Sequence, residues 1–253
     1  MNSALLTQLE QHQLAGRKQL AVLIDPDKAG ERGLVQLARS AQKLQADYFF
    51  VGGSLMTTNR LDQVLSVLRE ESDIPTLLFP GGVTQISEKA DGILLLSLIS
   101  GRNPEFLIGA HVIAAPLLRE SGIQILPTGY MLIDGGRATT VSYISNTTPI
   151  PADKPEIAAC TAMAGEMLGL RLIYMDAGSG AQRPIDEAVI QAVRKSVKLP
   201  MIVGGGIREG HAAAAAFRAG ADVVVVGNAL EDRPAFLDEL AAVRYQANLH
   251  LSA

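Results

Sequence analysis

The sequence has few of the residues that mark nucleic-acid binding, disulfide scaffolds or metal clusters. Tryptophan is absent, aromatic residues make up 4% of the chain, and 22 Lys and Arg stand against 26 Asp and Glu, for a net charge of −4. Proteins that bind nucleic acid normally present a basic face, and single-strand binders stack bases on aromatic rings. One cysteine, Cys160, excludes a disulfide framework and a cysteine-rich metal site. We therefore expect no nucleic-acid partner.

Long hydrophobic runs are also missing. Apolar runs such as residues 92–99 are well short of the ~20 residues that span a bilayer. Segment 1–20 is interrupted by polar residues and has no signal-peptide core. Hydrophobic residues still make up 48% of the chain and charged residues 19%, which suits a large buried core. We expect a globular, cytoplasmic protein without stable membrane insertion.

Short runs rich in β-branched residues alternate with helical patterns along the chain. Apolar residues at three- and four-residue steps predict a helix over 33–44, for example. The strand-like runs are apolar throughout, which indicates burial on both faces of a parallel sheet. Eight β/α units in 253 residues favour an α/β fold, a single (β/α)₈ barrel over 1–253, over an open doubly wound sheet. The predicted strands cover 19–25, 48–53, 76–81, 92–100, 124–133, 172–176, 201–203 and 222–226.

Two segments depart from the regular β/α rhythm. Residues 81–90 are too short and weakly patterned for a full helix, so we expect the third helix to be degenerate or lost. Residues 135–155 form a long irregular insertion rich in Thr, Ser and Pro. Loops of that length are uncommon unless they are lids or binding loops. A surface excursion or a subunit contact is an equally good interpretation.

Glycines gather where the last three predicted strands end. The sixth strand runs into the sequence YMDAGSG over 174–180, the seventh into GGGIR over 204–208, and the eighth into Gly227 and Asn228. Glycine lets backbone N–H groups approach an anion closely, and a following helix N-terminus adds a favourable dipole. Such endings after strands seven and eight are the usual phosphate cradle of these barrels. One glycine pair alone would indicate only a tight turn, but three predict a phosphate monoester site.

Tyr174 and Asp176 alternate on one predicted strand, so both can point into the barrel mouth. A phenol and a carboxylate beside a phosphate can hydrogen-bond hydroxyls of the same small molecule. Asp176 could also accept a proton as a general base. The alternative is that Asp176 caps the next helix and Tyr174 belongs to the core.

Oxygen donors follow the first two predicted strands. Strand one ends in Asp25, Pro26, Asp27 and Lys28, and Ser54 follows strand two. Mg²⁺ prefers one or two carboxylates together with substrate phosphates and water. The motif around Asp25 alone is more typical of a polar turn, but with Ser54 beside it we predict a magnesium site.

In their order along the chain, these motifs resemble the geranylgeranylglyceryl phosphate synthases and the related bacterial heptaprenylglyceryl phosphate synthases. The resemblance implies a modified (β/α)₈ barrel without its third helix. It also implies Mg²⁺-dependent transfer of a prenyl group, mainly geranylgeranyl, from its diphosphate to the C3 hydroxyl of sn-glycerol 1-phosphate. The motifs are AVLIDPDK (21–28), FFVGGSL (49–55), LLFPGG (77–82), ILLLSLISGRNP (93–104), PTGYMLIDGG (127–136), YMDAGSG (174–180), VGGGIR (203–208) and VVGN (225–228).

The same resemblance implies roles for individual residues. Asp25 and Ser54 would hold Mg²⁺, and Asp176 with Tyr174 would act in catalysis. Leu23 stands where some branches have Lys, and Asp176 where many have Glu. The residues that would bind sn-glycerol 1-phosphate are Tyr174, Met175, Asp176, Ala177, Gly178, Ser179, Gly180, Gly204, Gly205, Gly227 and Asn228.

The resemblance also bears on assembly and on the prenyl tail. The insertion at 135–155 is similar to that of the larger family branch that forms higher oligomers, so we expect a homo-oligomer, from dimer to hexamer. The tail needs a long apolar groove, for which the ends of strands four and five and the helix around 106–118 are candidate walls.

Two other functions are compatible with the phosphate cradle. A phosphosugar isomerase or synthase of the histidine or tryptophan biosynthetic type would use Asp25 and Asp176 as an acid and base pair. A non-catalytic barrel that senses a phosphometabolite is less favoured, because the sequence contains no second domain or DNA-reading motif.

Overall fold

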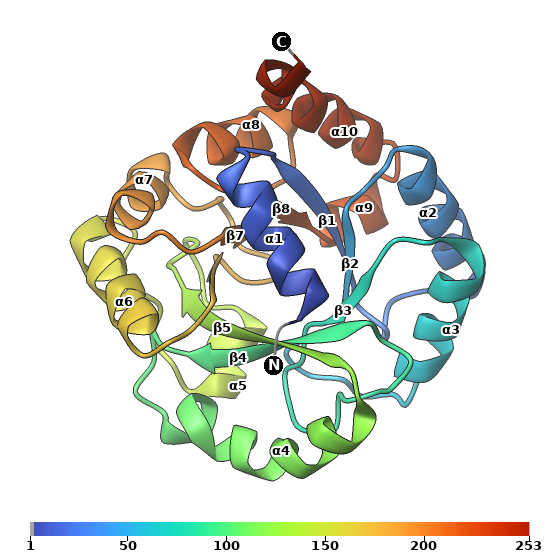
Figure 1. Ribbon diagram of the computed structural model, residues 1–253, viewed down its shortest axis with the longest axis horizontal. Coiled ribbons are helices and arrows are strands. Elements are labelled where there is room, and N and C mark those ends of the chain that lie inside the picture. Colours follow the sequence, from blue (N-terminus) through green and yellow to red (C-terminus); the bar gives the residue numbers. More distant parts are fainter. Residues whose placement is uncertain (1–2, 253) are drawn as a thin grey trace.

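Eight parallel strands close into one barrel in the computed structural model, which describes residues 3–252 (Figure 1). Each strand pairs with the next along the chain, and β8 pairs with β1. The predicted barrel is confirmed, and all eight predicted strands are present. They are β1 Gln19–Ile24, β2 Tyr48–Val51, β3 Thr76–Leu78, β4 Gly92–Leu98, β5 Gln124–Leu132, β6 Leu172–Asp176, β7 Met201–Gly204 and β8 Val223–Val226.

Helices surround the barrel in the connections between strands (Figure 1). Most of them turn an apolar face to the sheet; α2, for example, buries Leu34, Ala38 and Ala41. The α-helices are α1 Ala4–Leu14, α2 Glu31–Lys43, α3 Leu61–Glu71, α4 Ala110–Ser121, α5 Thr140–Ser145, α6 Pro155–Met167, α7 Glu187–Ser196, α8 Gly210–Ala219, α9 Asn228–Asp232 and α10 Phe236–Ala247. A 3₁₀ turn, η2, covers Leu249–Ser252. None of the helices within residues 3–252 has the length and apolar character needed to cross a bilayer.

The third barrel helix is missing, as predicted. Residues 79–91 lie between β3 and β4 and contain turns but no helix in the described chain. The helix expected around 106–118 is divided: a π-helical turn, η1 (Glu105–Gly109), precedes α4. The insertion at 135–155 is not wholly irregular, since it contains α5 and a β-bridge from Ile150 back to Ile133.

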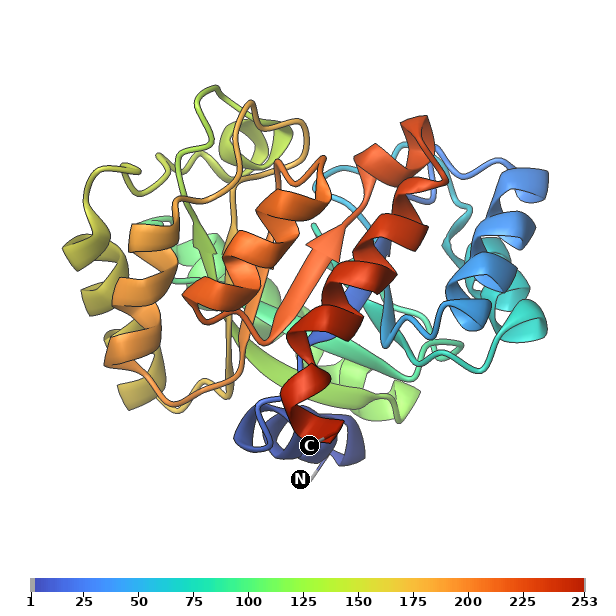
Figure 2. The ribbon, with the colours of Figure 1, turned by 90° about the horizontal axis from the view of Figure 1, so that it is seen from above.

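Helix α1 was not predicted from the sequence. It lies across the amino end of the barrel, opposite the βα loops (Figure 2). Leu5, Leu6 and Leu9 are buried among the inward-facing strand residues, so the helix closes this end of the barrel. The Ser3 side chain accepts from the Leu6 N–H at 3.2 Å, and its hydroxyl donates to Gln124 at 2.8 Å. Polar residues interrupt the apolar pattern of this segment, so the sequence did not indicate a helix. Its stability comes from tertiary packing against the barrel.

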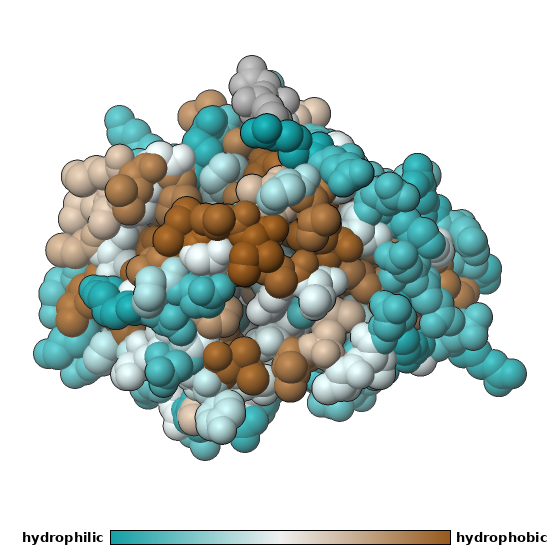
Figure 3. All heavy atoms as spheres, turned by 90° about the horizontal axis from the view of Figure 1, so that it is seen from below, coloured by the Kyte–Doolittle hydropathy of each residue, from teal (hydrophilic) through white to brown (hydrophobic). Residues whose placement is uncertain are grey.

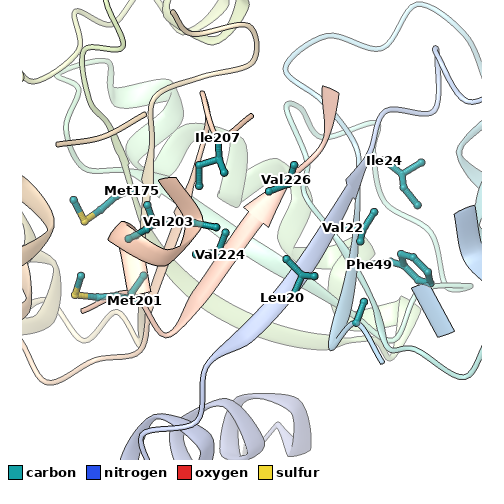
Figure 4. Close-up of a cluster of buried hydrophobic side chains, with 14 of the residues drawn as sticks. Leu20, Val22, Ile24, Phe49, Met175, Met201, Val203, Ile207, Val224 and Val226 are labelled. Carbon is teal, nitrogen blue, oxygen red and sulfur yellow. The ribbon is translucent and has the colours of Figure 1, made fainter. Parts of the chain in front are cut away.

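The core has two layers, separated by the strands. Inward-facing residues such as Leu94, Leu126 and Ile202 fill the barrel. Outward-facing residues pack against the helices, and Figure 4 shows part of this layer from β1, β6, β7 and β8. Burial on both faces explains the apolar strands. It also leaves the ends of the barrel as the places where polar strand residues can gather.

Candidate functional site

A polar cavity lies at the carboxyl ends of β1, β2, β6, β7 and β8. It brings together ten of the residues singled out in the sequence, from five separate segments. They are Asp25, Ser54, Tyr174, Asp176, Gly178, Ser179, Gly180, Gly205, Gly227 and Asn228.

Three of the residues expected to bind the acceptor do not line this cavity. Met175 is fully buried in the layer between barrel and helices, near Met201 and Val203 (Figure 4). Ala177 packs in the same layer, because side chains alternate along a strand and its continuation. Gly204 lies behind Tyr174, where an added Cβ would come within 2.9 Å of the phenol oxygen. The side chains of Met175 and Ala177 thus point away from the cavity, and for these two residues and Gly204 acceptor binding stays a prediction.

Asp176 is held by two hydrogen bonds. The Tyr130 hydroxyl donates to Oδ2 at 2.6 Å, and the Gly178 N–H donates to Oδ1 at 2.8 Å. Burial raises the pKa of Asp176, while these two hydrogen bonds act in the opposite direction. Asp176 does not cap the following helix, because α7 begins at Glu187 with Asp186 at its cap. The carboxylate instead lines the cavity.

Tyr130 was missed in the sequence. It lies on β5, directly opposite Tyr174 on β6, and both side chains point into the barrel. A signal was available: Leu126, Tyr130 and Leu132 share one face of the predicted fifth strand, so the phenol had to point inward. What the sequence did not show is that β5 and β6 pair in this register.

Tyr174 belongs to the core as well as to the cavity. Only 1% of its surface is exposed, and its ring stacks on Phe79 with centroids 5.0 Å apart. Tyr130 meets both rings edge-on, at 5.9 Å from Phe79 and 5.5 Å from Tyr174. This three-ring cluster has the tilted and offset geometries that aromatic quadrupoles favour. The cluster lies next to Asp176, whose carboxylate accepts a hydrogen bond from the Tyr130 hydroxyl.

The glycine turns present backbone donors to the cavity. The N–H groups of Ser179, Gly180, Gly205 and Gly206 have no hydrogen-bond partner among the described residues. Gly205 has φ +81°, and an added Cβ would lie 2.7 Å from the Ala177 nitrogen, so only glycine fits. Lys28 and Arg208 also line the cavity and supply positive charge. Free N–H groups and two cations are the chemistry that a phosphate monoester requires.

The βα loops after β1 and β2 are fastened together by Asp27. Its carboxylate accepts from the Thr57 N–H at 2.6 Å and from the Thr57 hydroxyl at 2.8 Å, and also bonds Thr58. The hydrogen bonds from Thr58 and Thr57 lower the pKa of Asp27 to about 2. Asp27 thus faces the second loop. Its hydrogen bonds hold Asp25 and Ser54 on the same side of the cavity.

The oxygen donors at this end fit a magnesium ion that also binds substrate phosphates. Asp25 and Ser54 both line the cavity. Gly53, which directly precedes Ser54, lies close to Asp25: an added Cβ would be 3.9 Å from the Asp25 carboxyl carbon. Lys28 Nζ is 3.4 Å from Asp25 Oδ2 and 3.9 Å from Glu231. Within residues 3–252, no three His, Cys, Asp or Glu side chains gather as a complete metal site. Mg²⁺ commonly uses one or two protein oxygens and takes the rest from phosphates and water.

An apolar groove adjoins the polar cavity. It runs from the segment that replaces the third helix, past the end of β4, to η1 and α4. The end of β4 and the helix around 106–118 were among the expected walls, whereas the segment that replaces the third helix was not. Phe106, Ala110, Ala114 and Leu118 line it from the helical side. Gly53, Ser54 and Phe79 line both the groove and the polar cavity, so the two meet at these residues.

The family model of the PcrB family matches residues 12–244. The chain belongs to the PcrB family. Similar proteins cover nearly the whole chain. The chain is 55% identical over 243 residues to a geranylgeranylglyceryl phosphate synthase of Spirosoma linguale, covering 96% of this chain and 98% of that protein. A protein of the same name from Chitinophaga pinensis is 54% identical, over 89% of this chain and 90% of its own.

A solved structure agrees with this assignment. (S)-3-O-geranylgeranylglyceryl phosphate synthase from Thermoplasma acidophilum, crystallised with its substrate sn-glycerol-1-phosphate, superposes with a TM-score of 0.88. The two chains are 31% identical, and 98% of each is covered. This PcrB-family chain therefore shares its fold with that enzyme along almost its entire length.

Proposed function

We propose that this protein transfers a prenyl group from a prenyl diphosphate, geranylgeranyl diphosphate first among them, to the C3 hydroxyl of sn-glycerol 1-phosphate. The observation that carries the proposal is the meeting of two unlike cavities at Gly53, Ser54 and Phe79. A phosphate-binding cavity joined to a long apolar groove suits a small polar acceptor and a lipid donor. A phosphosugar isomerase or a phosphometabolite sensor binds a small polar ligand, which would not fill an apolar groove. The names of the 55% and 54% identical relatives support the same reaction.

The acceptor is proposed to bind with its phosphate on the glycine turns of β6, β7 and β8. Ser179, Gly180, Gly205, Gly227 and Asn228 would surround the phosphate oxygens. Asn228 is already oriented, because its side chain exchanges hydrogen bonds with the Ser179 hydroxyl. The glycerol hydroxyls then lie toward Asp176 and Tyr174, deeper in the same cavity.

The donor is proposed to place its diphosphate beside Asp25 and Ser54 and its tail in the apolar groove. Asp25 and Ser54 would hold Mg²⁺, which neutralises negative charge on the diphosphate leaving group when it is bound. Lys28 adds a cation at the same place. The tail would pass Phe79 and run along the residues of η1 and α4. Binding in this way places the reactive C1 of the donor where the two cavities meet.

The chemical step then needs little more than proximity and a proton acceptor. The donor C1–O bond breaks, and its electron pair leaves with the diphosphate. The acceptor C3 oxygen forms the new bond to C1, and its proton passes to the Asp176 carboxylate. Holding both partners in reactive geometry supplies a large part of the rate enhancement.

We also propose that the protein works as a homo-oligomer in the cytoplasm. Apolar side chains on the outer face of η1 and α4, namely Ile108, Val112, Ile113 and Leu117, are more than half exposed. Figure 3 views the molecule from the side on which α4 lies in Figure 1 and shows a hydrophobic band across this face. Contiguous apolar patches of this kind mark contact surfaces. Light scattering at micromolar concentration tests the proposal, and a monomer would contradict it.

A single assay tests the function. The purified protein is incubated with radiolabelled sn-glycerol 1-phosphate, Mg²⁺ and geranylgeranyl diphosphate, and label is counted after organic extraction. We expect label in the organic phase, less of it with sn-glycerol 3-phosphate, and almost none after chelation of the metal. Farnesyl and heptaprenyl diphosphates in parallel reactions identify the preferred chain length. Label that stays in the aqueous phase with every donor would reject the proposed function.

A further inference from the structure

Among the described residues, Tyr130 alone lines the apolar groove and also donates a hydrogen bond to Asp176 of the polar cavity. The ring is among the walls of the groove, and the hydroxyl donates to Asp176 Oδ2 at 2.6 Å. The residue is 5% exposed and sits in the middle of β5, paired in register with Tyr174 of β6. It therefore separates the space for the donor tail from the space for the acceptor.

We propose that Tyr130 is a positioning residue, whose hydroxyl holds the Asp176 carboxylate toward the acceptor hydroxyl at the point where the groove delivers the prenyl C1. This inference rests on the proposed prenyl transfer. Tyr130 acts through Asp176, and its ring at the same time forms part of the wall that directs the donor.

The surroundings of Asp176 show why the carboxylate needs this support. It forms no ion pair in the described chain, and Lys28, which also lines the cavity, pairs with Asp25 and Glu231. Arg208 turns a guanidinium N–H to the Ala181 carbonyl at 3.1 Å. The titratable groups that face Asp176 from its neighbouring strands are Tyr130 and Tyr174. Hydrogen bonds from Tyr130 and Gly178 are thus the contacts that favour its charged form.

A phenol suits this task because it stays a donor. Burial, followed by the charge of Asp176, raises the pKa of Tyr130 well above its usual value. The hydroxyl therefore keeps its proton wherever the carboxylate is ionised. The ring cannot swing away, since it packs edge-on against Phe79 and Tyr174. A fixed neutral donor preorganises the carboxylate before the acceptor arrives, which is how an active site avoids reorganisation during the reaction.

The test removes the hydroxyl and keeps the ring. For Tyr130→Phe we expect kcat to fall about tenfold to a hundredfold, the usual range for losing a hydrogen bond to a charged group. The donor KM should change by less than about twofold, because the groove wall is intact. The acid limb of the kcat profile should move to higher pH, because the charged carboxylate has lost a donor. Tyr130→Ala removes the ring together with the hydroxyl. It should therefore lower kcat and also raise the donor KM.

Two controls separate positioning from general stability. Tyr48→Phe removes a second buried phenol hydroxyl, at the amino end of the barrel, where it accepts from Gln19 at 2.8 Å. It should leave kcat and the pH profile as in the wild type. In an Asp176→Asn background, Tyr130→Phe should cost nothing further, since the hydroxyl acts through the carboxylate.

Three results decide the matter. A Tyr130→Phe enzyme with wild-type kcat and an unmoved acid limb would overturn the inference while leaving the proposed function intact. Equal losses from Tyr130→Phe with and without the Asp176 carboxylate would also overturn it, because the phenol would then act independently. A wild-type protein that transfers no prenyl group would reject the proposed function, and the positioning role with it.

Discussion

The polar cavity and the apolar groove are built in different ways, although they share Gly53, Ser54 and Phe79. The polar cavity depends largely on backbone: the glycine turns after β6, β7 and β8 line it, and Gly205 and Gly206 have positive φ. The groove depends on a missing element, because residues 79–91, between β3 and β4, contain no helix in the described chain. The shape of the polar cavity is therefore determined by local backbone geometry, whereas the groove exists because the third barrel helix is missing.

This difference predicts how each half tolerates change. The closely packed glycine turns leave no room for an added side chain, so even one methyl group at Gly205 should weaken acceptor binding. A groove lined by aliphatic side chains can repack, because volume-conserving changes in apolar regions cost little. Mutations in the polar half should therefore reduce kcat or acceptor binding sharply, whereas mutations in the groove should alter donor preference gradually.

The largest effect is expected for Asp25→Asn. Losing the carboxylate that would hold Mg²⁺ removes several kcal/mol of charge stabilisation, about a thousandfold in kcat/KM. The side chain lies at the barrel mouth, so the thermal midpoint should stay close to the wild-type value. Rates measured at limiting and saturating Mg²⁺ check this prediction. A variant with wild-type rates at limiting Mg²⁺ would remove Asp25 from the mechanism.

Gly205→Val should raise the acceptor KM by about a hundredfold, from steric exclusion of the phosphate and the cost of strained backbone. The donor KM should change far less. Because φ is +81° and the new Cβ meets backbone at 2.7 Å, this variant should also be less stable. Gly169→Val is the matched control: φ there is +88°, so the backbone strain is similar, but Gly169 does not line the cavity and both KM values should stay at the wild-type level. Equal changes in both KM values would indicate a folding defect instead.

Asp176→Asn should lower kcat about tenfold to a hundredfold, at the low end for a general base because the allylic donor is highly reactive. The reaction requires ionised Asp176, and burial raises the pKa of this group. Wild-type activity should therefore fall as the pH is lowered, with a midpoint above that of an ordinary aspartate. The activity of Asp176→Asn should not show this fall at low pH. Wild-type kcat and acceptor KM in both Asp176→Asn and Asp176→Ala would reject a catalytic role.

The smallest effect is expected in the groove. Ala110→Phe narrows it from the helical side and should raise the KM for geranylgeranyl diphosphate about fivefold, near the cost of mild overpacking. The KM for a shorter farnesyl donor should change less, and the acceptor KM should not change. Steady-state kinetics with both donors measure the difference. An equal loss with both donors would show that Ala110 does not face the distal part of the tail.

The sequence predicted much of this site because strand ends obey simple rules. Period-two alternation correctly pointed Tyr174 and Asp176 inward, and the same rule, had it been applied, would have excluded Met175. Tyr130 escaped because its importance depends on the pairing of β5 with β6, a long-range fact. Asp27 escaped for the same reason: its partners Thr57 and Thr58 are about 30 positions away in the chain.

The eight strands, the β/α repeat that favours a barrel, the glycine turns and the missing third helix were predicted from the sequence, because each depends on patterns within short segments of the chain. Only the tertiary structure decided that α1 closes the amino end of the barrel, that Asp27 ties two loops together, and that the Tyr130 hydroxyl reaches Asp176. Those contacts join residues from different strands and loops. Their geometry depends on strand register and barrel closure, which arise only when the whole sheet has formed.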